Sequence, residues 1–276
     1  MFNIDYNSYR SISGFNQRTR FLIFHYTALN FSESVKALTS NAVSAHYLIP
    51  DPTDATYIDS GFKDLRIFNL VNENDRAWHA GVSAWSGRSN LNDTSLGIEL
   101  VNQARDDNGI ITFLPYHPQQ IAALKLLAIN ILQRYPDISP TNIIGHSDVS
   151  PGRKSDPGAL FPWKELHLSG VGAWYDEESK IKYCKQFKKN PPNKNDILEK
   201  LKTYGYGYGY GYGYGYGYGY GYGYGYGYDT TKAEDNQVYQ QLIRSFQLHF
   251  RPENYSGNVD VETVAILYSL VDKYKS

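Results

Sequence analysis

The sequence predicts an α/β domain followed by a small helical unit. Two observations lead to this prediction. In residues 1–176, short apolar segments of strand length are interleaved with a long amphipathic helix, which is the pattern of an α/β domain. Residues 229–276 contain two amphipathic helical stripes. The hydrophobic fraction of 41% suffices for a packed core, and the lack of any long apolar run predicts no transmembrane segment.

A low-complexity repeat separates these two regions. The chain of 276 residues holds 26 Tyr and 24 Gly, and residues 204–228 are a strict Tyr-Gly alternation that accounts for 13 and 12 of them. Because glycine favours conformational freedom, we expect this tract to be a flexible linker that tethers two domains. Self-association through stacked aromatic strands is the alternative.

The segment before the repeat is basic. Residues 177–203 carry 8 Lys against 4 acidic side chains and contain the break Pro191-Pro192. This pattern predicts a basic helix followed by a linker. The single cysteine, Cys184, lies here and is expected to be a surface thiol.

The elements of the first domain follow from apolar periodicity. The expected helices cover residues 33–39 and 118–135; the second has Pro118 at its first position and Pro136 after its end. One face of this long helix carries apolar side chains at spacings of three and four. The expected strands cover residues 20–25, 45–49, 65–71, 95–101 and 142–145.

Two of the seven histidines, His25 and His146, come at the ends of apolar strands. Ligands of α/β proteins bind at the carboxyl ends of strands, so we expect both side chains to face a crevice. The loop after His146 is rich in Pro and Gly, which exclude helix and sheet, and it returns Asp156 toward the histidines. Two imidazoles and a carboxylate leave one position of Zn²⁺ open, as in catalytic zinc sites. The alternative is two partly buried histidines with hydrogen bonds at strand ends.

Two charged residues could carry chemistry beside such a metal. Glu99 interrupts an apolar strand and lies on the face opposite Ile98 and Leu100. It is either a general base for a water molecule at the metal or an ordinary solvent-facing strand residue. Lys154 lies two residues before Asp156 and either stabilises an oxyanion or is an exposed loop charge.

Five motifs occur in an order that resembles a known family, the type 2 zinc-dependent N-acetylmuramoyl-L-alanine amidases (AmpD/AmiD-like and peptidoglycan-recognition-protein-like). The resemblance covers roughly residues 15–170. The motifs are Phe-His-Tyr-Thr-Ala at 24–28, Ser-Ala-His-Tyr-Leu-Ile at 44–49, Trp-His-Ala-Gly at 78–81, Ser-Leu-Gly-Ile-Glu at 95–99 and Gly-His-Ser-Asp-Val-Ser-Pro-Gly-Arg-Lys-Ser-Asp-Pro-Gly at 145–158.

The resemblance implies a fold, a cofactor and an activity. The fold is a central mixed β-sheet flanked by helices, with one zinc ion in a surface groove on His25, His146 and Asp156. The implied activity is hydrolysis of the amide between N-acetylmuramic acid and L-alanine in peptidoglycan, the bacterial cell-wall polymer, or in its fragments. Recognition of peptidoglycan without hydrolysis is the alternative, and the complete ligand set argues against it.

The resemblance also implies roles around the metal. Glu99 matches the catalytic acidic position, and Lys154 matches the lysine that helps to stabilise the transition state. His79 matches the part of the family that lines the substrate groove, and Tyr47 is expected near it.

The C-terminal segment has a resemblance of its own, to the small helical peptidoglycan-binding domain. The similarity rests on residues 238–251 and on Gly257 to Leu267, which include an Asp-x-Glu-Thr motif. Within residues 229–276, Leu242, Phe246 and Phe250 form an apolar stripe, and Asp260 can cap the second helix. A helical dimerisation hairpin is the alternative. With only 48 residues the segment is near the lower size limit of an independent domain, which favours packing against the amidase domain.

Charge and the N-terminus bear on partners and compartment. The net charge of −1 gives no reason to expect a nucleic-acid partner. A peptidoglycan-binding domain favours the cell envelope or periplasm. The visible N-terminus has no apolar signal region, which favours the cytoplasm instead.

Overall fold

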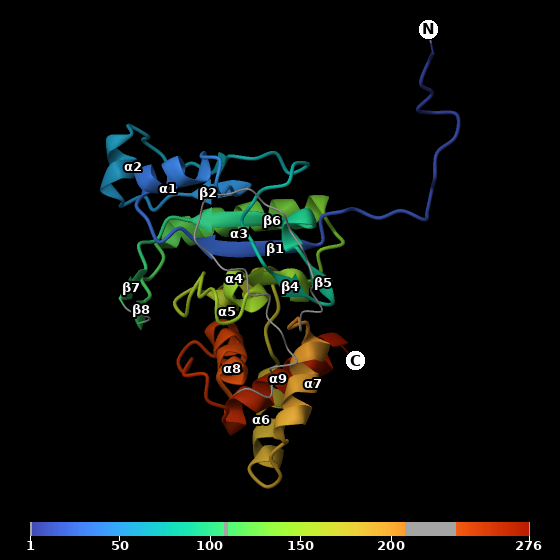
Figure 1. The fold of residues 1–276 in the computed structure, drawn as a ribbon, viewed down its shortest axis with the longest axis vertical. Helices are drawn as coiled ribbons and strands as arrows, with labels where there is room; N and C mark the ends of the chain where they lie inside the picture. Colours follow the sequence, from blue (N-terminus) through green and yellow to red (C-terminus); the bar gives the residue numbers. More distant parts are fainter. Residues whose placement is uncertain (1, 108–109, 208–235, 276) are drawn as a thin grey trace.

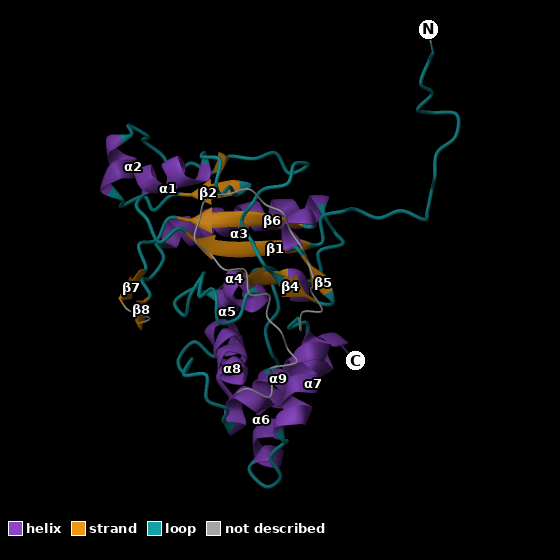
Figure 2. Cartoon of the chain, viewed as in Figure 1, coloured by secondary structure: helices purple, strands orange, loops and turns teal. Residues whose placement is uncertain are grey.

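The computed structural model describes residues 2–107, 110–207 and 236–275, and its centre is a five-stranded sheet (Figures 1 and 2). The strand order is β3-β2-β6-β1-β9. Every neighbouring pair is parallel except β2 and β3, so the expected mixed sheet is confirmed. The strands are β1 (Phe21–Tyr26), β2 (Tyr47–Ile49), β3 (Phe68–Asn69), β6 (Ser95–Leu100) and β9 (Ile143–Gly145).

The central strands are apolar because both faces of the sheet are covered. Phe21 to Phe24 of β1 are all buried, as expected for an inner strand of a parallel sheet. The expected strand over 65–71 was too long. Only two residues of β3 join the sheet, at its edge, where they pair with Tyr47 and Leu48 of β2.

The helices of the first domain largely match the expectation. The helix α1 (Phe31–Leu38) begins after Asn30, whose side chain accepts a hydrogen bond from the Glu33 amide. The helix α3 (Pro118–Arg134) has Pro118 in its first turn and buries its apolar face against the sheet. A third helix, α2 (Ala55–Asp59), was not expected and is capped by Asp54. Figure 1 shows α1 and α2 beside β2, at one edge of the sheet.

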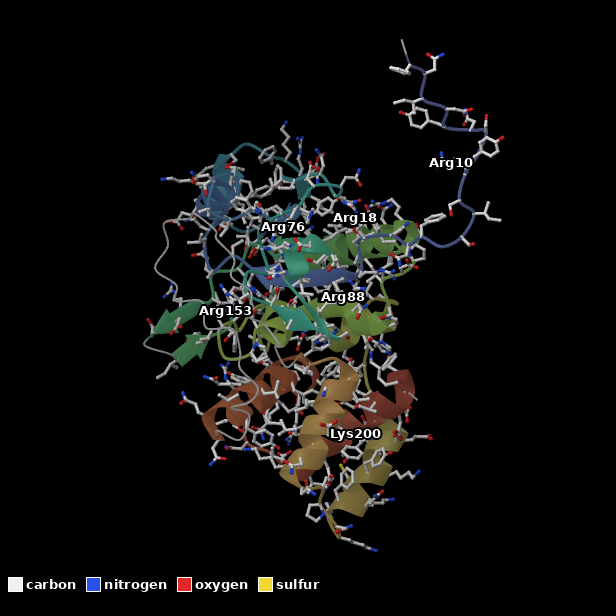
Figure 3. The ribbon with its side chains drawn as sticks, turned by 45° about the vertical axis from the view of Figure 1, so that its right-hand side comes forward. Arg10, Arg18, Arg76, Arg88, Arg153 and Lys200 are labelled. Atoms are coloured by element: carbon white, nitrogen blue, oxygen red, sulfur yellow. The ribbon has the colours of Figure 1, made fainter. Side chains whose placement is uncertain are left out.

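Two small hairpins complete the first domain. One joins β4 (Ala84–Trp85) to β5 (Arg88–Ser89), and the other joins β7 (Arg105–Asp107) to β8 (Ile110–Thr112). Ser86 and Gly87 both have positive φ, which is the two-residue turn that suits a hairpin. Residues before β1 extend away from the body, and Arg10 lies on this arm (Figures 1 and 3).

Among the described residues, the helical unit contains the two helices expected after the repeat, α8 (Asn236–Phe250) and α9 (Val261–Lys275). It also contains the expected basic helix of 177–203, α6 (Glu177–Phe187), and one helix that was not expected, α7 (Lys194–Tyr204). The expectation of a helix followed by a linker over 177–203 is therefore wrong in its second half. After Pro191-Pro192 the chain starts a new helix, where Asn193 and Asp196 form a capping box. In the part of the chain that the structure describes, no helix is long and apolar enough to span a bilayer.

The helix α8 packs directly on the α/β domain. The ring of His249 stacks on Trp163 with 3.7 Å between ring centroids, and Phe250 contacts Trp174. The expected apolar stripe of α8 is buried in a core that is continuous with that of the sheet. As expected, Asp260 caps α9 by accepting a hydrogen bond from the Thr263 amide at 2.9 Å. The helical unit therefore rests on the α/β domain.

The start of the Tyr-Gly repeat belongs to this core. Tyr204 ends α7, and both Tyr204 and Tyr206 are buried, with Tyr206 against the ring of Trp85. The expected linker of residues 204–228 therefore does not begin at Tyr204. Residues 208–228 of the expected linker lie outside the described residues.

Candidate metal centre and pocket

The register of the sheet places two candidate residues side by side. His25 and Glu99 are direct partners on the parallel strands β1 and β6, close to the carboxyl ends of both. Laterally paired residues project from the same face of a sheet. His146 follows β9 directly as the first residue of α4 (His146–Val149). The sheet thus brings these side chains to the edge where a ligand site was expected.

The loop after β9 contains one element that the sequence did not predict. Pro and Gly were expected to exclude helix there, yet α4 forms one helical turn before Pro151. The carbonyl of Asp156 then accepts a hydrogen bond from the Ser147 amide at 2.8 Å, so the loop closes on itself. This closure returns the Asp156 side chain to His146.

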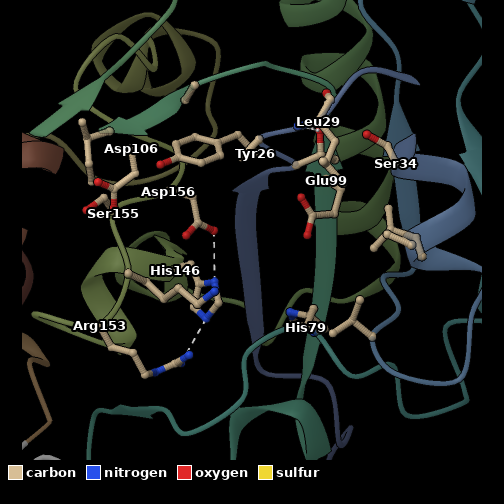
Figure 4. A pocket seen from close by; sticks show the side chains of 18 of the residues that line it. Tyr26, Leu29, Ser34, His79, Glu99, Asp106, His146, Arg153, Ser155 and Asp156 are labelled. Carbon is tan, nitrogen blue, oxygen red and sulfur yellow. Dashed lines mark hydrogen bonds and ion pairs between the residues drawn. The ribbon is translucent and has the colours of Figure 1, made fainter. Parts of the chain in front are cut away.

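The three expected ligand side chains converge. His25 Nδ1 lies 3.1 Å from His146 Nδ1 and 2.9 Å from Asp156 Oδ2, and His146 Nδ1 lies 3.0 Å from Asp156 Oδ2. All three residues are buried. Zinc bonds of about 2.0–2.1 Å to N and O in a tetrahedron place the ligand atoms about 3.3 Å apart, so the three atoms lie close enough together to share one ion of this size. Figure 4 shows His146 and Asp156 facing the cavity.

The second nitrogen of each imidazole is also engaged. His146 Nε2 lies 3.0 Å from the carbonyl oxygen of Ala80, and His25 Nε2 lies 3.0 Å from His79 Nδ1. Metal-binding histidines in proteins are oriented by such contacts of the other ring nitrogen. Both rings therefore present Nδ1 to the cluster.

Electrostatics put these groups in the protonation states that a metal requires. Burial alone would raise the pKa of Asp156, but the neighbouring His146 and His25 outweigh it and hold that pKa below its ordinary range. Burial lowers the pKa of His146 to about 4, against the opposing effect of Asp156. At neutral pH the site therefore offers a charged carboxylate and a neutral imidazole.

Glu99 points into the same cavity (Figure 4). Its Oε2 is buried and has no hydrogen-bond partner among the residues that the structure describes. Burial raises the pKa of Glu99 to about 7, with His25 and Lys154 acting in the opposite direction. An unpaired carboxylate of this kind can exchange a proton near neutral pH.

The cavity has a volume of about 380 Å³ and combines apolar and charged walls. Lys154 and His79 line it, as expected from the sequence. Tyr47 does not, which corrects the expectation for that residue. Its hydroxyl donates to Glu73 Oε1 at 2.6 Å in a separate polar depression that Arg134 and Tyr135 also line.

Arg153 was not among the expected site residues, although it contacts a proposed metal ligand. Arg153 lines the cavity beside His146, and its guanidinium donates to the carbonyl oxygens of Ala80 and Val82 (Figures 3 and 4). It therefore ties the ligand loop to the segment that carries His79. The sequence could have indicated Arg153, because this residue adjoins Lys154 inside the longest of the five motifs.

Known amidases resemble this chain in sequence and in fold. The family model described as N-acetylmuramoyl-L-alanine amidase, Amidase_2, matches residues 15–159. The N-acetylmuramoyl-L-alanine amidase AmiD of Escherichia coli (strain K12) is 40% identical over 259 residues, which cover 93% of this chain and 84% of AmiD.

Two solved structures of relatives resemble the whole chain. AmpDh3 from Pseudomonas aeruginosa, in complex with anhydromuramic pentapeptide, has a TM-score of 0.90 and 53% identity and covers 100% of both chains. AmiD from E. coli, in complex with the substrate anhydro-N-acetylmuramic acid-L-Ala-D-gamma-Glu-L-Lys, has a TM-score of 0.77 and 37% identity over 96% of this chain and 93% of AmiD. With the family model and AmiD both matching over these lengths, the chain belongs to the Amidase_2 family of N-acetylmuramoyl-L-alanine amidases.

Proposed function

We propose that this chain is a zinc-dependent amidase that hydrolyses the bond between N-acetylmuramic acid and the L-alanine of a peptidoglycan stem peptide. The observation that carries the proposal is the buried cluster of His25, His146 and Asp156 with the unpaired carboxylate of Glu99 in the same cavity. Membership of the amidase family supports this identification of the bond that is cleaved.

One metal ion would be held by His25 Nδ1, His146 Nδ1 and an oxygen of Asp156. When bound there, zinc supplies a Lewis acid that polarises a carbonyl group and lowers the pKa of a water molecule. Three protein ligands leave a position open, which is the arrangement of catalytic zinc sites.

Glu99 moves the protons of the reaction. In its charged form it accepts a proton from the attacking water, and in its neutral form it donates that proton to the departing amine of L-alanine. Burial raises the pKa of Glu99 to about 7 in the metal-free protein, which brings both protonation states within reach near neutral pH. Glu99 Oε2 has no hydrogen-bond partner among the described residues, so no existing bond must break before it accepts the proton.

Lys154 supplies positive charge beside the reacting carbonyl. It lines the cavity between Arg153 and Asp156, and its charge reaches Glu99 and His146. As the carbonyl oxygen gains negative charge in the transition state, the Lys154 ammonium stabilises it. The cavity wall at His79 is proposed to lie along the substrate.

The substrates we propose are peptidoglycan fragments that carry an anhydro sugar. This rests on the two relatives whose structures hold anhydromuramyl peptides, one of which covers the whole chain. A cavity of about 380 Å³ is within the size range of small-molecule sites. It suits the lactyl group and the first residues of a stem peptide.

The role of the helical unit in wall binding stays a proposal. Leu242, Phe246 and Phe250 are buried against the rest of the chain, so a peptidoglycan-binding surface on this unit uses other side chains. Co-sedimentation of the whole chain with insoluble peptidoglycan tests binding. Fractionation of cells tests the proposed location in the cell envelope.

Zinc content and product release together test the activity. The unmodified chain is expected to hold one zinc ion and to release stem peptide, and a chelator is expected to stop the release. Glu99→Gln is expected to keep the zinc but to lose about 10²–10⁴-fold in rate, the usual contribution of a general base. Glu165→Gln, an exposed carboxylate on α5 (Trp163–Leu168), is the control and should retain full activity. Substrate retention without release by the unmodified chain would favour recognition without hydrolysis and contradict the proposal.

A further inference from the structure

A line of hydrogen bonds runs from the ligand cluster into the sheet. His25 Nε2 lies 3.0 Å from His79 Nδ1, and His79 Nε2 lies 3.2 Å from Ser95 Oγ. The Ser95 hydroxyl in turn donates to the carbonyl oxygen of Leu91 at 2.6 Å. His25, His79 and Ser95 are all buried, so water does not compete for these bonds.

The direction of every bond in this line follows from its last member. A carbonyl oxygen can only accept, so the single proton of the Ser95 hydroxyl points at Leu91. Ser95 Oγ must then accept from His79, which places the His79 proton on Nε2. His79 Nδ1 is left as an acceptor and takes the proton of His25 Nε2. The lone pair of His25 is thereby confined to Nδ1, the atom that faces His146 and Asp156.

The position of the His79 ring is fixed from two sides. Its backbone amide and that of Ala80 both donate to Asn92 Oδ1, at 3.1 and 2.8 Å. Its ring lies directly over Gly97 of β6, where a Cβ atom would be 2.4 Å from His79 Cγ. A side chain at position 97 would therefore displace the ring, which explains a glycine in the middle of this buried strand.

We propose that His79 is a positioning residue that, with Ser95 and Gly97, holds His25 in the tautomer that binds zinc. This inference rests on the proposed function, since it requires zinc at His25. It goes beyond the expectation that His79 lines the substrate groove, because its hydrogen bond reaches a metal ligand. Loss of an outer partner of this kind typically lowers metal affinity by about 10–100-fold.

The test measures zinc affinity by competition with a chromophoric chelator. His79→Phe keeps a buried ring but removes both nitrogens, and we expect it to weaken zinc binding by about 10–100-fold. His79→Asn retains an acceptor near the position of Nδ1 and should recover most of this loss. Gly97→Ala keeps the His79 nitrogens but displaces the ring, and it should weaken zinc binding as well.

His46→Phe is the matched control. His46 is also buried, and its ring lies 5.7 Å from that of His79. Its ring nitrogens bond to the Gly97 amide and the Asp75 carbonyl, and neither reaches His25. We expect His46→Phe to bind zinc as the unmodified chain does. Unchanged affinity in His79→Phe, or an equal loss in His46→Phe, would overturn the proposal.

A measurement on the unmodified chain avoids any effect on folding. Long-range ¹H–¹⁵N correlation spectra of the zinc-free protein, with ¹⁵N-labelled histidine, report the tautomer of each ring. The expected result is a proton on Nε2 of both His25 and His79, and a proton on Nδ1 of His79 would overturn the inference. A chain that binds no zinc and cleaves nothing would instead contradict the proposed function. A zinc-binding, active chain whose affinity does not depend on His79 would contradict only this inference.

Discussion

The hydroxyl of Tyr206 is expected to stabilise the fold, although Tyr206 is one of the many tyrosines of the Tyr-Gly repeat. Asp148 is fully buried, and its carboxylate accepts hydrogen bonds from the Gly145 amide at 2.8 Å, Tyr206 Oη at 2.6 Å and His249 Nδ1 at 2.7 Å. These bonds join the base of the ligand loop to α8 and to the start of the repeat. Burial and Asp148 hold the pKa of Tyr206 well above its ordinary value, so the phenol remains a donor.

Tyr206→Phe removes one of these three donors and keeps the ring contacts with Trp85 and Phe246. A hydrogen bond to a charged group contributes about 1.5–3 kcal/mol, so the free energy of unfolding should fall by about 2 kcal/mol. For a chain of this size that corresponds to a drop in Tm of about 4–8 °C.

Tyr204→Phe is the matched control. Tyr204 is also buried and packs on Trp85, but the structure gives its hydroxyl no hydrogen bond to the residues it describes. Its removal should leave the Tm unchanged. Thermal and urea unfolding at a fixed zinc concentration measure both variants, because bound zinc itself shifts the transition. Equal Tm values for Tyr206→Phe and Tyr204→Phe would refute the stabilising role of the Asp148 bonds.

Three further changes have expected outcomes. The value of kcat/KM should decrease as pH falls through the pKa of Glu99. Burial raises this pKa to about 7 in the metal-free protein, and a bound cation lowers it. The residual activity of Glu99→Gln should not show this decrease at acidic pH. Lys154→Met should lower kcat by about 10²–10³-fold in single-turnover assays with little change in KM, and a change in KM alone would argue against a role in the transition state. Glu73→Gln should destabilise the fold near neutral pH. Burial opposes ionisation of Glu73, but hydrogen bonds from Arg134 and Tyr47 lower its pKa in the folded protein. The stability that Glu73 contributes is therefore present above its unfolded pKa of about 4.3 and is lost as pH falls through the folded pKa. Urea unfolding over this pH range measures the loss.

The site was predictable where a strand ends in a functional residue. The apolar runs of β1 and β9 end at His25 and His146, and parallel strands bring their carboxyl ends together, so the pattern made both histidines candidates for one crevice. The Pro and Gly residues of the following loop made Asp156 a candidate partner. Two hydrogen-bonded histidines were the alternative on these patterns, and the resemblance to the amidase family joined the three residues in one metal site.

Tyr47 shows where such reasoning fails. The register pairs Tyr47 with Ile98, whereas Leu48 pairs with Glu99, which in turn pairs with His25. Tyr47 is therefore one residue away from the row that contains the site and projects from the opposite face of the sheet. Only the register between strands that are far apart in the sequence reveals this, and the sequence does not specify that register.

The helix α7 was missed for a different reason. Its sequence is mostly polar, and its buried face consists of Ile197, Leu201 and Tyr204. The last of these lies in the repeat and was set aside as linker. The helix α7 packs on α9, and Tyr204 contacts Phe250 of α8; both helices come after the repeat, so no local pattern could reveal these contacts.

The identity of the cleaved bond decides whether this chain is an N-acetylmuramoyl-L-alanine amidase. The zinc-loaded chain is incubated with a purified anhydro-N-acetylmuramyl peptide, and the products are analysed by mass spectrometry. We expect two products, the anhydro-N-acetylmuramic acid with a free lactyl carboxylate and a peptide with a free L-alanine amino terminus. A substrate that remains intact, or one cut at a glycosidic bond or between two amino acids, would contradict this assignment.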